Sequence, residues 1–151
     1  MTDLYFAYGS NLHPARMTAR IPSAEGLGVA ALHGLRLVCN KLGRDGTAKA
    51  NLESAPKARV LGVLWRLPED GWRALDEVEV GYQRVLVEVE QQGSWRPAQT
   101  YRSTLLSADV RLRADYKRWI VEGARAQGLP ATWLARLEVL PVLDPPAERR
   151  T

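Results

Sequence analysis

The sequence predicts an α+β fold that is rich in strands through its middle and has two helices near its end. Apolar runs with β-branched and aromatic residues recur up to residue 103, as is typical of strands. In the last third, apolar residues recur instead at helical spacing. A length of 151 residues suits one domain with its own core. We assign this domain to residues 1–143 and expect a flexible tail at 144–151.

The first predicted strand covers residues 3–8 and stops abruptly at Gly9-Ser10-Asn11. Glycine followed by Ser and Asn favours a tight turn, and such a turn often serves only to redirect the chain. Its backbone N–H groups can also form a nest that binds a carboxylate or an oxyanion. A short helix is expected next, at 13–20, with Pro14 in its first turn.

The middle of the chain contains four apolar runs that predict strands: 28–39, 60–67, 85–90 and 98–103. Gly34 is expected to mark a bulge or a turn within the first run. Residues 41–47, which contain Asp45-Gly46, predict a loop. Gln92-Gly93 predicts the turn that joins the last two strands.

Three further helices are expected. Pro68, followed by two acidic residues, starts a helix that reaches Glu79. Residues 111–127 carry the clearest apolar stripe at helical spacing. Gly128 ends that helix, and Pro130 starts the last one.

The composition excludes several classes of protein. At 46% hydrophobic and 25% charged, the chain resembles a globular protein rather than a disordered one. It has no apolar run of about 18 residues and no signal-peptide pattern, so we expect no membrane association and a cytoplasmic location. Its single cysteine, Cys39, excludes an intramolecular disulfide, and with His13 and His33 it makes a poor metal set. Cys39 lies in an apolar run and is interpreted as a buried small side chain rather than a nucleophile.

The net charge of +4 is spread along the chain, with no block of like charges before the tail. A diffuse positive charge suits a small anionic substrate as well as a phosphate backbone. The five tryptophans are scattered and do not form a stacking platform. We therefore expect a small-molecule partner and no nucleic acid. The sequence does not distinguish a monomer from a homodimer.

Three carboxylates lie close together where the helix after Pro68 ends. Asp76 and Glu77 are interpreted as part of a solvated helix face. Glu79 differs, because it is flanked by Val78 and Val80 at the junction with the next strand. Partial burial there would raise the pKa of Glu79 toward the range useful for proton transfer at neutral pH. Opposite the Gly-Ser-Asn turn it would supply the base that the turn lacks, but the sequence does not show that the two segments meet.

Together, these two segments make the chain resemble the γ-glutamylcyclotransferase family. The match also includes a strand between the two segments and a helical run near the end, in the family's order, and its parts are Phe6–Leu12, Gly62–Trp65, Leu75–Glu79, Tyr116–Ala124 and Gly128–Pro130. The resemblance therefore covers nearly the whole chain.

The resemblance implies a mixed sheet curled into a small closed or partly open β-barrel, with helices outside and a pocket at one mouth. It also implies that a γ-glutamyl amino acid or γ-glutamylamine cyclises to 5-oxoproline and releases the free amine. The substrate's own α-amine is then the nucleophile, so neither a protein nucleophile nor a cofactor is required. The protein has to orient the substrate, bind the oxyanion and move a proton.

The resemblance also implies roles for individual residues. Glu79 matches the catalytic glutamate, which takes a proton from the α-ammonium and gives one to the leaving nitrogen. The loop expected to hold the carboxylate and the oxyanion, mainly through backbone N–H groups, consists of Tyr8, Gly9, Ser10, Asn11 and Leu12. Tyr82 and Tyr116 lie near positions where relatives have pocket tyrosines, although Tyr116 fits core packing equally well. Arg84 is expected to face solvent.

Two departures from the family pattern leave the substrate open. Val80 stands where relatives usually have glycine, with Gly81 one residue later, and Thr104 stands where some relatives have tyrosine. Free γ-glutamyl amino acids, γ-glutamylamines and the γ-glutamyl-ε-lysine type all remain candidates. The Val80 departure also keeps an alternative open, in which the chain is a binding or regulatory module that retains the pocket without turnover.

Overall fold

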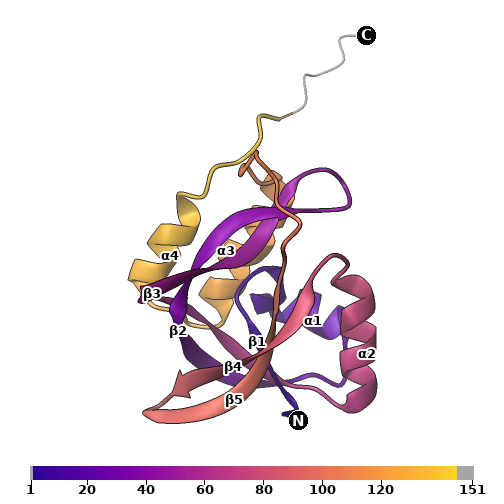
Figure 1. Cartoon of the computed structure of the whole chain (residues 1–151), viewed down its shortest axis with the longest axis vertical. Coiled ribbons are helices and arrows are strands. Elements are labelled where there is room, and N and C mark those ends of the chain that lie inside the picture. The colour runs from indigo at the N-terminus through magenta and orange to yellow at the C-terminus, as the bar shows by residue number, and fades with distance from the viewer. Residues whose placement is uncertain (1, 146–151) are drawn as a thin grey trace.

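A closed barrel of five strands forms the centre of the computed structural model, which describes residues 2–145 (Figure 1). The strands, in chain order, are β1 (Leu4–Ala7), β2 (Glu25–Leu42), β3 (Ala48–Arg66), β4 (Gln83–Gln91) and β5 (Ser94–Arg102). Their order around the barrel is β1-β3-β2-β4-β5. Strand β1 pairs antiparallel with β3 and parallel with β5, which closes a mixed sheet. The expected α+β barrel is confirmed, in its closed form.

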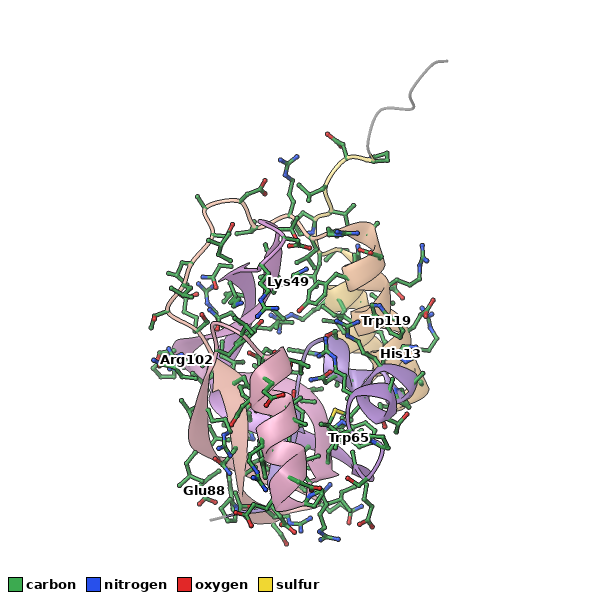
Figure 2. All side chains as sticks on the ribbon, turned by 90° about the vertical axis from the view of Figure 1, so that its right-hand side faces the viewer. His13, Lys49, Trp65, Glu88, Arg102 and Trp119 are labelled. Carbon is green, nitrogen blue, oxygen red and sulfur yellow. The ribbon has the colours of Figure 1, made fainter. Side chains whose placement is uncertain are left out.

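The helices lie outside the barrel, with α2 and α4 on opposite sides of it in Figure 1. They are α1 (Pro14–Arg20), α2 (Glu69–Val78), α3 (Ala114–Ala126) and α4 (Ala131–Glu138), and a short 3-10 turn, η1 (Ser10–Leu12), follows β1. Helix α3 packs against η1, α1 and α4. At Gly123 a Cβ atom would lie only 2.7 Å from the Cα of His13, so glycine permits this close packing. Figure 2 shows His13 beside Trp119 of α3, with ring centroids 4.6 Å apart.

Strands β2 and β3 form one long antiparallel hairpin. Its register shifts between His33 and Leu35, and Gly34 lies there with φ +86°. The bulge expected at Gly34 is therefore confirmed. The predicted strand at 60–67 begins too late, because the observed strand, β3, starts at Ala48. Residues 48–59 alternate polar with small side chains and contain Pro56, so only their pairing with β2 makes them a strand.

Two predicted helix boundaries also need correction. Helix α3 begins at Ala114 rather than at residue 111, because Arg113 has extended backbone and Leu112 forms a β-bridge with Val142. The preceding helix, α2, ends at Val78, so Glu79 is its C-cap rather than a residue of its last turn. Of the tail predicted at 144–151, residues 146–151 lie outside the described residues.

The core fills the barrel and the space between the sheet and the helices. The largest fully buried side chains come from the sheet, from the helices and from the segments between them: Phe6, Leu12, Met17, Leu64, Leu67, Leu75, Leu112, Ile120 and Leu137. Gly62 of β3 leaves room for the ring of Phe6 and the carbonyl of Ala7 on the neighbouring strand. Cys39 is buried, as expected. Within residues 2–145, no helix has the length and apolar character needed to cross a membrane.

Candidate active site

The turn after β1 and Glu79 meet at one pocket, which encloses about 310 Å³ of empty space. Ten residues from five parts of the chain line it: Tyr5, Tyr8, Gly9, Ser10, Asn11, Ala50, Glu79, Tyr82, Tyr101 and Tyr116. The juxtaposition that the sequence alone does not show is therefore present. Of the residues expected at a substrate site, only Leu12 is absent from this lining.

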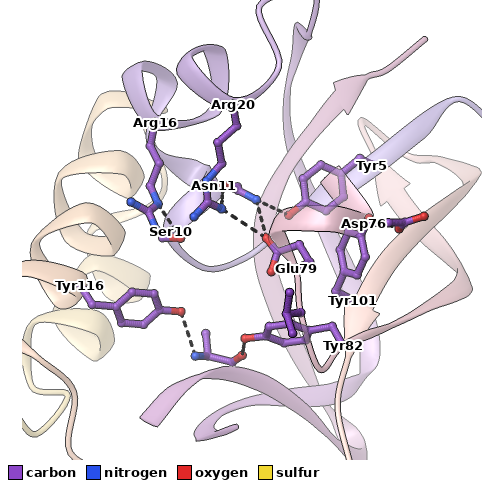
Figure 3. A network of polar contacts seen from close by, with 12 residues as sticks. Tyr5, Ser10, Asn11, Arg16, Arg20, Asp76, Glu79, Tyr82, Tyr101 and Tyr116 are labelled. Atoms are coloured by element: carbon purple, nitrogen blue, oxygen red, sulfur yellow. Dashed lines mark hydrogen bonds and ion pairs between the residues drawn. The ribbon is translucent and has the colours of Figure 1, made fainter. Parts of the chain in front are cut away.

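One carboxylate oxygen of Glu79 is fixed by hydrogen bonds (Figure 3). The Asn11 side-chain amide donates to Oε1 at 2.9 Å, and Nη1 of Arg20 lies 3.4 Å from the same oxygen. Oε2 accepts no hydrogen bond from the residues that the structure describes. The Glu79 side chain is 15% exposed, so the carboxylate is largely withdrawn from water while one oxygen remains free for a ligand.

Burial raises the pKa of Glu79 above its ordinary value, because desolvation disfavours the charged carboxylate. The Arg20 guanidinium, the Asn11 hydrogen bond and the ammonium of Lys41 oppose this effect and favour the charged form. The net direction is upward. An upward shift brings the pKa of a carboxyl group closer to the neutral range, which suits a group that takes up and releases a proton in general acid–base chemistry.

The Asn11 side chain connects α1, β1 and Glu79. Its Oδ1 accepts from Nη1 of Arg20 at 2.9 Å, and its Nδ2 also donates to the Tyr5 hydroxyl at 3.0 Å. The indole N–H of Trp65 donates to the Asn11 carbonyl at 3.1 Å. Because Arg20 can only donate, Oδ1 must face α1 and Nδ2 must face the carboxylate. From the sequence, Asn11 was expected to act mainly through its backbone N–H group, and Tyr5, Arg20 and Tyr101 were not among the predicted site residues.

Three backbone N–H groups at the start of η1, including that of its N-cap Gly9, have no acceptor among the described residues. The amide of Leu12 donates to the carbonyl of Gly9 at 3.1 Å, whereas the amides of Gly9, Ser10 and Asn11 donate to no acceptor within residues 2–145. Leu12 itself is fully buried, so its amide closes the turn and its side chain packs in the core. Successive N–H groups of this kind attract an anion.

Gly9 leaves space between the turn after β1 and strand β3. A Cβ atom there would lie 3.1 Å from Cβ of Ala50 and 3.6 Å from the hydroxyl of Tyr116. A side chain at this position would therefore narrow the pocket beside the free amides.

Two of the pocket tyrosines hold the same residue of β3. The Tyr82 hydroxyl donates to the Ala50 carbonyl at 2.6 Å, and the Tyr116 hydroxyl accepts from the Ala50 amide at 3.0 Å. The Tyr8 hydroxyl donates to the Tyr101 carbonyl at 2.6 Å. Burial raises the pKa of all five pocket tyrosines: Tyr5, Tyr8, Tyr82, Tyr101 and Tyr116. They are neutral hydroxyls at physiological pH, and Tyr116 serves both packing and the pocket.

Arg84 and Asp76 do not line the pocket but are linked to it through Tyr101. Nε of Arg84 lies 3.0 Å from Oδ1 of Asp76, and its guanidinium lies 4.9 Å from the ring of Trp72. The same Asp76 oxygen accepts from the Tyr101 hydroxyl at 2.6 Å. Asp76 is exposed, as expected, yet it also fixes a pocket tyrosine. Glu77 is exposed.

Cations surround the side of the pocket formed by α1 and α3. Nε of Arg16 donates to the Ser10 hydroxyl at 3.1 Å, and its guanidinium lies 5.3 Å from the ring of Trp119. The ammonium of Lys49 lies 4.5 Å from the ring of Tyr116. The positive charges of Arg16 and Lys49 beside the pocket favour an anionic ligand.

Among the described residues, the pocket lining contains one carboxyl group, that of Glu79. Within 2–145, no three His, Cys, Asp or Glu side chains are grouped so as to hold a metal ion. Cys39 does not line the pocket, and burial raises the pKa of its thiol to about 12. Glu79 is therefore the titratable carboxyl group at the centre of the pocket.

Comparison with known proteins gives consistent matches. A model of the AIG2-like family matches residues 59–137. The γ-glutamylcyclotransferase of Mus musculus is 32% identical over 148 residues, covering 92% of this chain and 79% of the mouse protein. That of Homo sapiens is 31% identical over 147 residues, covering 91% and 78%. A solved structure of a γ-glutamyl cyclotransferase superposes with a TM-score of 0.88 at 29% identity, covering 98% of this chain and 93% of that one.

Proposed function

Because the chain belongs to the γ-glutamylcyclotransferase family, within the AIG2-like proteins, we propose that it converts a γ-glutamyl amino acid or a γ-glutamylamine to 5-oxoproline and the free amine. Glu79 acts as the general acid and base in this proposal. The observation that carries it is the free Oε2 of a buried carboxyl group in a pocket that is also lined by Gly9, Ser10 and Asn11, whose backbone amides have no acceptor among the described residues.

The reaction begins with a proton transfer from the substrate's α-ammonium to Oε2 of Glu79. The freed nitrogen lone pair then attacks the γ-carbonyl carbon, and the electrons of the C=O bond move onto its oxygen. Because nucleophile and carbonyl belong to one molecule, the protein has only to hold a folded conformer of the substrate. The amides of Gly9, Ser10 and Asn11 are the donors available to the resulting oxyanion.

Collapse of the tetrahedral intermediate completes the reaction. The C=O bond re-forms, the bond from carbon to the leaving nitrogen breaks, and Glu79 returns its proton to that nitrogen. The ring nitrogen loses its second proton to the released amine, which departs as an ammonium ion. Glu79 ends in the carboxylate form in which it started. A carboxyl group with a raised pKa suits both transfers, and the hydrogen bonds from Asn11 and Arg20 keep Oε1 out of them.

The alternative is a binding module that retains the pocket without turnover, and the motivating observation is Val80 in place of the usual glycine. The intact hydrogen bonds of Glu79 favour the enzyme. Purified protein is incubated with γ-glutamyl-alanine, γ-glutamyl-ethylamine and Nε-γ-glutamyl-lysine, and 5-oxoproline is measured. Product from at least one substrate supports the enzyme. Ligand-induced thermal stabilisation without product supports the binding module. The cytoplasmic location stays a prediction.

A further inference from the structure

Glu79 projects from a tight turn whose conformation determines where its carboxylate lies. The amide of Glu79 still bonds to Leu75 of α2 at 2.9 Å, and the amide of Tyr82 bonds back to the carbonyl of Glu79 at 3.2 Å. Between them, Val80 occupies the second position of the turn and Gly81 the third, with φ +82°. Gly81 has no side chain and that of Val80 is apolar, so neither residue can hold the turn by a side-chain hydrogen bond.

Lys41, at the end of β2, reaches this turn from a neighbouring element. Its Nζ donates to the carbonyl of Val80 at 2.6 Å and lies 4.6 Å from the ring centroid of Tyr82. The residue is only 4% exposed, and no carboxylate of residues 2–145 forms a salt bridge with it. A buried ammonium without an ion pair is costly, so its contacts with the turn must offset a substantial desolvation penalty.

A second side chain holds the next carbonyl of the same turn. The hydroxyl of Ser103, which follows β5, donates to the carbonyl of Gly81 at 2.6 Å and accepts from the amide of Leu105 at 3.0 Å. Ser103 is itself fixed by Asn51, whose Oδ1 accepts from the Ser103 amide at 2.9 Å. Two successive carbonyls are thus held by a charged donor from β2 and a neutral donor beyond β5.

We propose that Lys41 is a positioning residue for Glu79, which fixes the turn at Val80 and places a positive charge behind the carboxylate. Lys41 does not line the pocket, so it acts through the turn and through its charge rather than by touching substrate. The turn it holds is the one in which valine replaces the usual glycine. The catalytic part of this inference rests on the proposed function of Glu79.

The two contributions of Lys41 can be separated by experiment. Its charge favours the carboxylate form of Glu79, so Lys41→Met should raise the pKa of Glu79, whereas the neutral variant Ser103→Ala should loosen the turn without that rise. Lys41→Arg keeps the charge and should leave the pKa near the wild-type value. The other titratable and charged groups facing Glu79 are unchanged in these variants: Arg16 and Arg20 of α1, Tyr5, Tyr8, Tyr82, Tyr101 and Tyr116.

The first measurement is an NMR titration of the ¹³C-labelled Glu79 carboxyl group without substrate, in wild type, Lys41→Met, Lys41→Arg, Ser103→Ala and Lys57→Met. Lys57 is an exposed lysine of β3, so its variant is the matched control for loss of one charge. Far-UV circular dichroism establishes that each variant is folded. We expect a rise in the pKa for Lys41→Met alone. An unchanged pKa in Lys41→Met would overturn the electrostatic part, whatever the activity.

The second measurement is 5-oxoproline formation by the same variants. We expect kcat of Lys41→Met to fall by ~10–100-fold with KM changed by less than about 3-fold, because misplacing a catalytic group slows the chemistry more than binding. Ser103→Ala should also lower kcat.

A kcat of Lys41→Met within about 2-fold of Lys57→Met would overturn the positioning role. Absence of product in wild type would instead overturn the proposed function, while the titration still tests Lys41. If Lys41→Met does not fold, Lys41→Arg and Ser103→Ala test the same turn.

Discussion

Asn11 and Glu79 lie 68 positions apart in the chain and are joined by a hydrogen bond of 2.9 Å from Nδ2 to Oε1. This contact connects the turn after β1 to the end of α2 across the pocket. It fixes one carboxylate oxygen and leaves the other for the substrate. The side chain of Asn11 therefore prepares Glu79, in addition to any part played by its backbone amide.

Replacing Asn11 by alanine should lower kcat by ~10–100-fold, because Glu79 loses the neutral donor that orients it. Loss of that hydrogen bond should also move the acidic limb of the kcat–pH profile upward, since the bond favours the carboxylate form. Steady-state kinetics at several pH values checks both effects. Wild-type kcat and an unmoved limb would show that this hydrogen bond is dispensable.

The pKa of Glu79 also predicts how stability depends on pH. The folded-state pKa lies above the unfolded value, so folding favours the protonated form. The contribution of this group to stability is therefore greatest at low pH and falls as pH rises through the folded-state pKa. Glu79→Gln removes the penalty, and its Tm should exceed that of wild type by roughly 2–4 °C at pH 8.

That advantage of Glu79→Gln should shrink as the pH falls toward the folded-state pKa of Glu79, because the wild-type carboxyl group then becomes protonated. Thermal unfolding by circular dichroism at pH 8 and at a series of lower pH values measures it. A variant that is less stable than wild type at pH 8 would show that the hydrogen bonds from Asn11 and Arg20 outweigh the desolvation of the carboxylate.

Arg16 gives a prediction about the leaving group. It is half-buried beside the pocket, bonds to the Ser10 hydroxyl, and forms no salt bridge with a carboxylate of the described residues. We expect it to bind the carboxylate of a departing amino acid. Arg16→Ala should then raise KM for γ-glutamyl-alanine by about 10-fold or more, since a charge-assisted hydrogen bond is lost. γ-Glutamyl-ethylamine, which lacks that carboxylate, is the control substrate, and an equal rise for both would assign Arg16 to the glutamyl part.

Gly9→Ala should reduce activity while the fold survives. The new Cβ would lie 3.1 Å from Cβ of Ala50, at the edge of tolerable contact, and beside the amides expected to bind the oxyanion. We expect kcat/KM to fall at least ~10-fold, because the free amides become harder for the substrate to approach. Unchanged kcat/KM in a folded variant would remove these amides from the site.

Local patterns predicted most of the fold. The bulge at Gly34 and the end of a helix beside Glu79 could be predicted because glycine, proline and apolar periodicity act within a few residues. The strand at 48–59 could not, because its polar alternation and Pro56 become a strand only through pairing with β2. The closed barrel was expected only from the family resemblance, since closure depends on contacts between distant strands.

The candidate site, like the fold, could be predicted only in part from the sequence. Glu79 could be selected from its position between two valines at an element boundary. The contacts of Asn11 with Arg20 and Tyr5 could not, because they depend on how η1 packs against α1 and β1. A partial signal was present: Arg16 and Arg20 are four residues apart in a helix, so they share the face that meets the turn.

The most direct test is the rate of 5-oxoproline formation by wild type and by Glu79→Gln, with the best substrate of the γ-glutamyl panel. The variant keeps the shape of the side chain and can still accept from Asn11, but it cannot carry a proton. We expect product from wild type and a rate at least ~100-fold lower from Glu79→Gln, because the general acid–base step is lost. Equal rates from the two proteins would contradict the proposed role of Glu79.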